Sequence, residues 1–461
     1  MSAHRPSLPL RTLLVTLTIL TTPLLASSPT LAATSGATLE WTQYHGSALG
    51  AGEIPVNAVH LRTPVWTSPT LDGQIFGQPL VFDSRVYVAT ENNSLYALSS
   101  FTGRVLWRTH LGTPVQAKSL PCGDIYPTVG ITGTPIIDPA RHELFAVAFE
   151  SRGARFTHVV VGLSTLNGMP LVSTPVDPPG VETGALLQRT ALALDHGSVV
   201  FGFGGNSGDC GPYRGRVVSV PEIGGAPRFF TIDATAHQRE GAVWMGAAGP
   251  VVDPRGNIWV ESGNGSVTTS GRPYDRSDAV LELSSSLRLE QFFAPSDWTD
   301  QNAADLDLSS SVALLGNGAV LGAGKAGYVY LLNKSHLGGI GGDLAHLDAC
   351  PGSMDGGVAV AGATVYFPCL GGVVAVQASL HPLELRELWS SGQGGSSPVY
   401  TRTQVLSLGG DGVLVALNRR SGHLESSFTL SGVANHFPTP GFGDGHVLVA
   451  QSRSVVAFAT S

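Results

Sequence analysis

The feature that most constrains the fold is a unit of four short apolar runs, which is clearest near the N-terminal end of the chain. These runs occupy residues 77–82, 84–90, 94–98 and 103–107. Asp83, Asn92-Asn93 and Thr102-Gly103 mark the boundaries between these runs, and these residue types favour tight turns. Four alternating strands joined by such turns predict one antiparallel meander sheet.

The same unit returns along the chain at intervals of about 40 to 60 residues, the spacing expected of propeller blades. First strands are predicted to start near Pro79, Pro135, Ala191, Pro250, Val312, Val358, Pro398 and Pro440. The composition agrees, because 58 Gly and 30 Pro with only 13% charged residues suit short strands and tight turns. The sequence therefore predicts an all-β, eight-bladed β-propeller, with seven blades as the alternative.

The two ends of the repeat region predict how the ring closes. The last unit has room for only three strands, within 438–442, 446–450 and 455–459. Before the first unit lies a further short apolar run, 63–68, which contains Trp66. We expect this N-terminal strand to complete the last blade, so that no sheet edge stays open. The propeller then spans 63–461, and 34–62 is an N-terminal extension.

Residues 1–33 have the features of a secretory signal peptide. Arg5 and Arg11 give a basic start, an apolar stretch follows from Leu13 to Ala26, and small residues end at Ala33. The stretch is too short to serve well as a membrane anchor. The rest of the chain holds 24 basic and 34 acidic side chains, a net charge of −10, which disfavours nucleic acid as a partner. We expect a secreted or extracytoplasmic protein without a membrane anchor.

Four cysteines in an exported chain predict two disulfides, for which three pairings exist. Strand order places connections between blades on the same face as the turns between second and third strands. The long insertions lie on that face, within 114–131, 206–215, 263–277, 294–308 and 340–357. Cys350 precedes a first strand and Cys369 ends the second strand of that blade, so these two can meet locally, which leaves Cys122 and Cys210 to join loops of neighbouring blades. The expected pairs are Cys122–Cys210 and Cys350–Cys369.

Several turns resemble a known repeat. Residues 97–107, Ala-Leu-Ser-Ser-Phe-Thr-Gly-Arg-Val-Leu-Trp, are similar to the quinoprotein (PQQ-type) propeller repeat, whose pattern is Ala-x-Asp-x-x-Thr-Gly-x-x-x-Trp. Residues 416–422 are a weaker copy that lacks the Trp. The resemblance implies that Trp66, Trp107 and Trp389 dock neighbouring blades. The family includes PQQ-dependent alcohol dehydrogenases and the scaffold lipoprotein of outer-membrane barrel assembly, so it implies the fold more than one function.

Three residues match the quinoprotein site if the resemblance extends to activity. Asn264, in Gly263-Asn264-Gly265, would bind calcium beside the cofactor. Asp297, in Asp297-Trp298-Thr-Asp300, would be the catalytic base and a metal ligand. Lys325 would contact the quinone oxygens of PQQ. The chain departs from the dehydrogenases in having no adjacent Cys-Cys pair, and its Asp297 segment is spaced differently.

These departures favour a binding or scaffold module over an enzyme. The expected partner is a protein, glycan or small molecule at the channel face. The alternative is a PQQ- and calcium-dependent oxidoreductase acting on alcohols or sugars. A second alternative is a secreted hydrolase, for which the chain shows no nucleophile motif.

Overall fold

The computed structural model describes residues 1–2, 40–233, 235, 237–433 and 437–461. Contacts divide the chain into two compact units, Met1–Ala37 and Thr38–Ser461. Apart from its first two residues, the predicted signal peptide lies outside the described residues. Among the described residues, no helix is long and apolar enough to cross a membrane.

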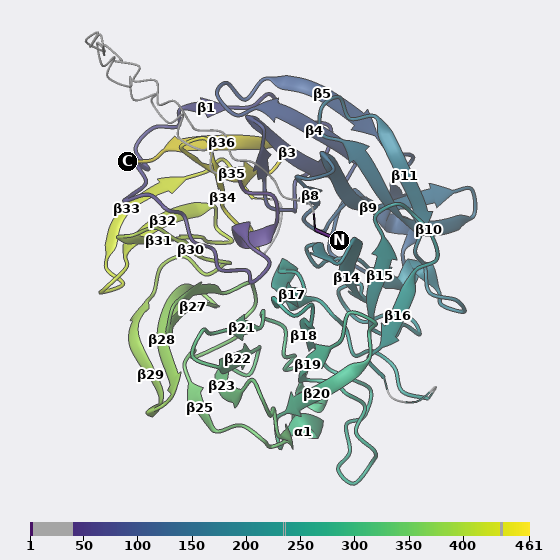
Figure 1. Cartoon of the computed structure of the whole chain (residues 1–461), viewed down its shortest axis with the longest axis vertical. Coiled ribbons are helices and arrows are strands. Elements are labelled where there is room, and N and C mark those ends of the chain that lie inside the picture. Colours follow the sequence, from purple (N-terminus) through teal and green to yellow (C-terminus); the bar gives the residue numbers. More distant parts are fainter. Residues whose placement is uncertain (3–39, 234, 236, 434–436) are drawn as a thin grey trace. The chain divides into compact units, whose positions relative to one another are not determined.

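The second unit is an eight-bladed β-propeller, as predicted, with each blade a four-stranded antiparallel meander (Figure 1). The first four blades are β2–β5 (Leu80–Phe82, Arg85–Thr90, Ser94–Ser99, Val105–His110), β8–β11 (Ile136–Asp138, Glu143–Arg152, Arg155–Ser164, Pro170–Pro175), β13–β16 (Ala193–Asp195, Ser198–Gly205, Arg216–Pro221, Arg228–Thr231) and β17–β20 (Val251–Val252, Ile258–Ser262, Ala279–Leu283, Leu289–Ala294). Blades 5 to 7 are β21, β22, β23 and β25 (Ala313–Leu314, Ala319–Ala323, Tyr328–Asn333, Ala345–Asp348), β26–β29 (Ala359–Ala361, Thr364–Cys369, Gly372–Leu380, Leu383–Ser391) and β30–β33 (Val399–Tyr400, Gln404–Leu408, Val413–Asn418, Leu424–Thr429). Every first strand begins within two residues of its predicted position.

Blade 8 confirms the predicted closure of the ring. Its chain-terminal strands are β34 (Gly441–Gly443), β35 (His446–Gln451) and β36 (Ser454–Ala459), and its fourth strand is β1 (Trp66–Thr67). Trp66 pairs with Ala457 and Thr67 with Val456 in antiparallel register. The two ends of the propeller thus share one sheet, which leaves no open strand edge at the junction.

The loops carry a few short elements. The ribbon β6 (Val115–Gln116) and β7 (Thr128–Val129) precedes blade 2, β12 (Leu186–Leu187) pairs with β14, and β24 (Gly339–Ile340) extends blade 4 in parallel. The one α-helix of the described chain, α1 (Trp298–Ala304), follows blade 4, and single 3-10 turns are η1 (Tyr44–Gly46), η2 (Ala117–Ser119), η3 (Thr183–Ala185) and η4 (Met245–Ala247).

The three tryptophans of the repeat pack on the turn of the next blade. Trp66 donates a hydrogen bond from Nε1 to the carbonyl of Ser100 at 2.9 Å, and its ring lies against Gly103. A Cβ at Gly103 would lie 2.4 Å from the Trp66 ring, so the turn needs glycine there. Trp107 packs in the same way on Gly168, and Trp389 on Gly422. The Thr-Gly turn and the Trp are therefore two halves of one contact between blades.

The N-terminal extension fills the end of the channel at which first and second strands are joined. Its backbone, from Trp41 to Gly52, bonds to the innermost strands of five blades (Figure 1). The partners are Val81, Ile137, Val252, Val360 and Tyr400. Trp41, Tyr44 and His45 are buried in the channel. This plug, residues 41–54, was predicted only as an extension without a structural role.

Glu261 in β18 predicts how stability depends on pH. It is fully buried, its Oε1 accepts one bond from the Ala323 amide at 3.1 Å, and burial raises its pKa to about 8. The folded protein then binds a proton that the unfolded chain releases near its usual pKa of about 4.5, so stability is lost as pH rises toward 8.

We therefore expect Glu261→Gln to stabilise the protein at pH 9 by about 2 kcal/mol and to change little at pH 5. Thermal melts at both pH values measure this, with the exposed Glu290→Gln as the matched control. An equal effect of Glu261→Gln at the two pH values would contradict the assignment.

Candidate functional site

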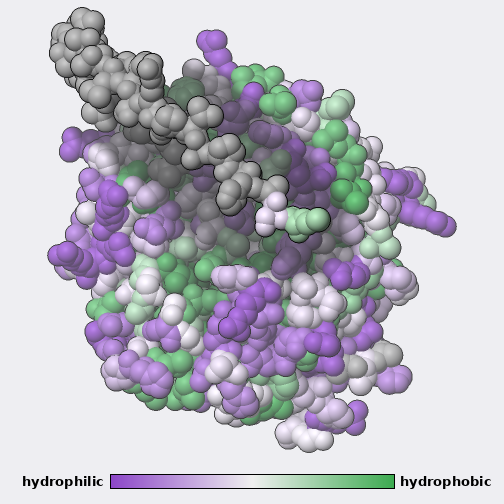
Figure 2. Space-filling model, viewed as in Figure 1, coloured by the Kyte–Doolittle hydropathy of each residue, from purple (hydrophilic) through white to green (hydrophobic). Residues whose placement is uncertain are grey.

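A pocket of about 250 Å³ opens at the channel end where second and third strands are joined, opposite the plug. Its walls come from connections of blades 2 to 8, which is where the sequence placed the long insertions. The residues that line it include Arg189, Asp209, Trp244, Asp305, Lys325 and Asp355. On the face seen in Figure 2, hydrophilic and hydrophobic residues mix in small groups.

Trp244 forms one wall of this pocket. Its Nε1 donates to the carbonyl of Gly205 at 3.1 Å, and Lys325 Nζ lies 5.6 Å from the ring centroid. A Cβ at Gly204 would lie 1.9 Å from Trp244 Nε1, so the approach requires glycine. Sequence reasoning missed Trp244. The signal was its position in a connection between blades, whereas Trp66, Trp107 and Trp389 lie in outer strands.

Lys325 lies between two carboxylates. Its Nζ forms an ion pair with Asp307 Oδ2, and Asp305 Oδ1 is 3.4 Å away. Burial alone would lower the pKa of Lys325, but the charges of Asp307 and Asp305 outweigh it and raise that pKa. Lys325 is therefore a permanently charged ammonium at the pocket wall.

Asn264 joins the same cluster from the end of blade 4. Its backbone N–H donates to Asp307 Oδ1 at 2.6 Å, and its own side-chain Oδ1 is buried without a hydrogen-bond partner among the described residues. Asn264, Asp307 and Lys325 thus form one group, in which Asn264 and Lys325 were predicted as site residues. A buried oxygen without a donor is costly unless a ligand supplies one.

Asp297 lies elsewhere and does not line the pocket, unlike the position the resemblance implied. It is exposed, immediately precedes α1, and its Oδ1 accepts a bond from Gln301 Nε2 at 3.0 Å. The seven-residue helix separates it by roughly 10 Å from Asp305, at the helix C-cap. The acidic residues that line the pocket are instead Asp124, Asp209, Asp305 and Asp355, and the fully buried Asp307 is paired with Lys325.

Arg189 supplies a second cation. Its side chain is 8% exposed and its guanidinium lies between the rings of Phe76 and Phe437, at 5.4 and 5.0 Å from their centroids. Burial lowers the pKa of Arg189, while the negative charges of Asp124 and Glu91 act in the opposite direction. Arg189 is thus a mostly buried cation at the pocket wall, with carboxylates near it.

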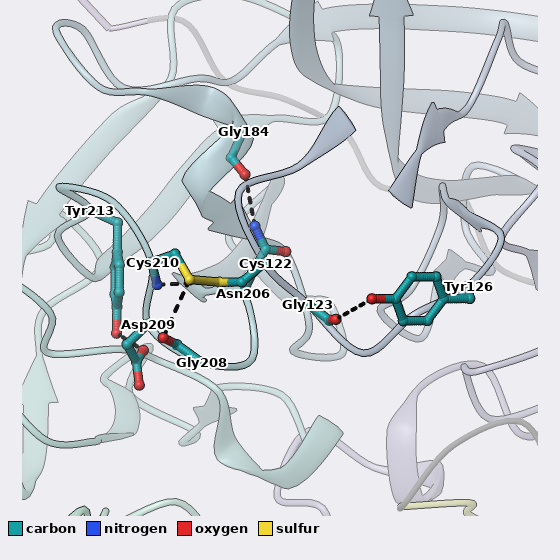
Figure 3. Close-up of a disulfide and its surroundings, with 9 residues drawn as sticks. All are labelled: Cys122, Gly123, Tyr126, Gly184, Asn206, Gly208, Asp209, Cys210 and Tyr213. Atoms are coloured by element: carbon teal, nitrogen blue, oxygen red, sulfur yellow. Dashed lines mark hydrogen bonds between the residues drawn. A yellow bond between two sulfur atoms is a disulfide. The ribbon is translucent and has the colours of Figure 1, made fainter. Parts of the chain in front are cut away.

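The Cys122–Cys210 disulfide lies behind the pocket loop formed by residues 205–209 (Figure 3). A Cβ on Gly208, which lines the pocket, would lie 3.6 Å from Cys122 Sγ. Asn206 and Asp209 anchor the loop through Gly184 and Tyr213. The second disulfide joins Cys350, in the connection from blade 5 to blade 6, to Cys369 at the end of β27. Both pairs are those expected from the strand order.

The oxygen donors present would only begin a calcium site. Asn264 and Asp307 are in contact through the Asn264 backbone N–H and supply at most three side-chain oxygens, whereas calcium prefers six to eight. Among the described residues, no group of three or more His, Cys, Asp or Glu side chains is arranged to hold a metal ion. Further ligands would have to come from a bound cofactor or water.

The blades and their docking turns define a quinoprotein-like β-propeller, and comparisons with known proteins agree. The family model described as outer membrane protein assembly factor BamB matches residues 53–271. A polyvinylalcohol dehydrogenase from Pseudomonas sp is 23% identical over 228 residues, which cover 45% of this chain and 32% of the relative. The chain thus matches about a third of that relative's length.

Solved structures show the same fold. A quinohemoprotein alcohol dehydrogenase from Pseudomonas putida HK5 gives a TM-score of 0.70 at 12% identity, covering 92% of this chain and 80% of that one. One from Comamonas testosteroni gives 0.70 at 13% identity, covering 91% and 80%. The chain thus resembles the PQQ-type, quinoprotein-like β-propellers in its repeats and shares their fold.

Proposed function

We propose that the protein is a quinoprotein-type oxidoreductase acting on alcohol groups, with PQQ bound in the pocket beside Trp244. The observation that carries this is a flat indole wall flanked by two cations, Lys325 and Arg189. The dehydrogenases among the relatives support it over the binding module that the sequence favoured.

The pocket suits a flat, anionic quinone. Trp244 offers a face for stacking, Arg189 a guanidinium for carboxylates, and Lys325 an ammonium for quinone oxygens. The sequence objection was the missing adjacent Cys-Cys pair. Here a disulfide between distant cysteines, Cys122 and Cys210, supports the pocket loop 205–209 instead.

The residues around the pocket have different roles in the proposed oxidation. PQQ, when bound, accepts two electrons from an alcohol carbon, which becomes a carbonyl. Asp307 keeps Lys325 charged and in place, so that its ammonium can stabilise developing negative charge on an oxygen. Asp305 is the acidic side chain at the wall next to Lys325 and is the candidate acceptor of the hydroxyl proton. Asn264 and Asp307 would hold calcium.

Binding of PQQ tests the proposal apart from turnover. We expect Arg189→Gln and Trp244→Leu each to weaken PQQ binding at least ten-fold. The first substitution removes the cation for the PQQ carboxylates, and the second removes the ring on which the quinone stacks. Titration followed by tryptophan fluorescence and by the quinone absorption measures binding, and dye reduction with alcohols measures turnover. Arg104→Gln, an exposed arginine in a turn of the opposite face, is the matched control.

Absence of both binding and turnover with added PQQ and calcium would refute the proposal. Binding of PQQ without turnover would instead support the binding module that the sequence favoured.

We also propose that the protein is exported. Its four cysteines form two disulfides, which persist in oxidising compartments. The basic and apolar start of the chain fits a signal peptide.

A further inference from the structure

We propose that the substrate is an extended, uncharged chain carrying many hydroxyl groups, which lies in a trough over blades 6 and 7 and presents one hydroxyl to the pocket. This substrate class rests on the proposed function. The trough consists of two cavities, of about 620 and 420 Å³, that adjoin the pocket.

The cavities follow one another outward from the channel. The 620 Å³ cavity shares Asp355 and Phe437 with the pocket. It shares Leu370, Gly371 and Gly392 with the 420 Å³ cavity, which reaches Glu387 on β29, the outer strand of blade 6. Both cavities are larger than the pocket. Together they offer far more room than one short alcohol molecule would fill. Such a run of space fits a chain longer than the group that reacts.

The charge of the trough excludes an anionic chain. None of the described residues that line the two cavities is Lys or Arg, whereas Asp348, Asp355, Glu387 and Asp411 are acidic. An anionic polymer would be repelled, and its charges would find no partner. Lys325 in the pocket does not change this, because it is already paired with Asp307.

The surface of the trough favours hydrogen bonding to hydroxyls over stacking of rings. Glycine backbone forms much of both cavities, at 371, 372, 392, 394, 395 and 410. Gly371, Gly392 and Gly410 are exposed, and among the described lining residues the one aromatic residue is Phe437, next to the pocket. Asp355 is held in place by the hydroxyl of Ser309 at 2.5 Å and by that of Ser353. Fixed acceptors and bare peptide groups recognise hydroxyls at low cost in entropy.

Two glycines allow the trough to be filled without disturbing the fold. A Cβ on Gly392 or on Gly410 would meet nothing within 4 Å, and neither residue has a left-handed backbone. Gly392→Trp and Gly410→Trp should therefore fold normally and obstruct the trough. Gly316→Trp is the matched control, since Gly316 is equally open but lies in the turn between β21 and β22, outside the trough.

The experiment measures binding and turnover separately. Affinity electrophoresis without PQQ, in gels containing dextran or poly(vinyl alcohol), measures retention of the chain by a sugar-based or a carbon-backbone polyol. Dye reduction with PQQ and calcium compares 1-propanol with oligomers of the same two polymers. We expect at least a ten-fold loss of oligomer kcat/KM and of retention in Gly392→Trp and Gly410→Trp, with 1-propanol turnover and Gly316→Trp unchanged.

The arms separate the two proposals. Retention that the trough variants abolish supports the trough even if no turnover occurs, in which case only the proposed function fails. Normal turnover of 1-propanol with no retention, or with equal loss in Gly316→Trp, would overturn the trough. Retention by one gel alone identifies whether the chain is a sugar or a carbon-backbone polyol. Retention by a polyanion such as heparin, stronger than by either polyol, would also overturn it.

Discussion

Removing residues 40–69 should abolish the folded propeller. The deletion takes away β1, so the outer edge of β36 loses its partner, and it takes away the plug that bonds to five innermost strands. The buried apolar residues Trp41, Ile54, Val59 and Leu61 are lost with it. We expect aggregation and no cooperative melt, because the loss exceeds the usual stability of a domain, about 5–15 kcal/mol.

A point substitution keeps this prediction testable in a folded protein. Trp66→Ala removes both the packing on Gly103 and the bond to Ser100, and should cost about 3–5 kcal/mol. Val65→Ala, at a neighbouring position that is 49% exposed, should cost less than about 0.5 kcal/mol. Denaturant unfolding measures both. Equal effects of the two substitutions would contradict closure through Trp66.

Lys325→Met should have the second largest effect, on stability and on PQQ binding together. It leaves the fully buried Asp307 carboxylate without its cation, and removing one partner of a buried pair costs about 3–5 kcal/mol. The loss should shrink as pH falls, because an unpaired Asp307 then takes up a proton that removes its buried charge. Denaturant unfolding at pH 5 and pH 8 measures it.

A double variant separates the charge from the packing. Lys325→Met with Asp307→Asn should recover most of the stability but not the binding of PQQ, since the ammonium is still missing. Asp305→Asn, which removes the exposed partner, should cost less than about 1 kcal/mol. If the double variant were no more stable than Lys325→Met, the loss of stability would not come from the unpaired charge of Asp307.

Local pattern was enough to predict the eight blades. Alternation of apolar residues, tight turns and recurrence every 40 to 60 residues are properties of neighbours in the chain, so the first strands fall within two residues of their predicted starts. Closure followed from counting strands, and the cysteine pairs followed from sorting loops by face. Each of these inferences needs the order of the elements but no distance between side chains.

The composition of the pocket was decided by tertiary structure. Trp244 and Arg189 come from connections that carry no motif, and only the ring brings them opposite Lys325. Asp297 looked like the site residue because a Trp follows it, but α1 places it away from the pocket and delivers Asp305 and Asp307 instead. The plug was equally hidden, since its partners lie on five separate blades. Sequence by itself determined the repeating unit and its closure, because these depend on local periodicity; which side chains meet depends on loop geometry, which only the packed ring sets.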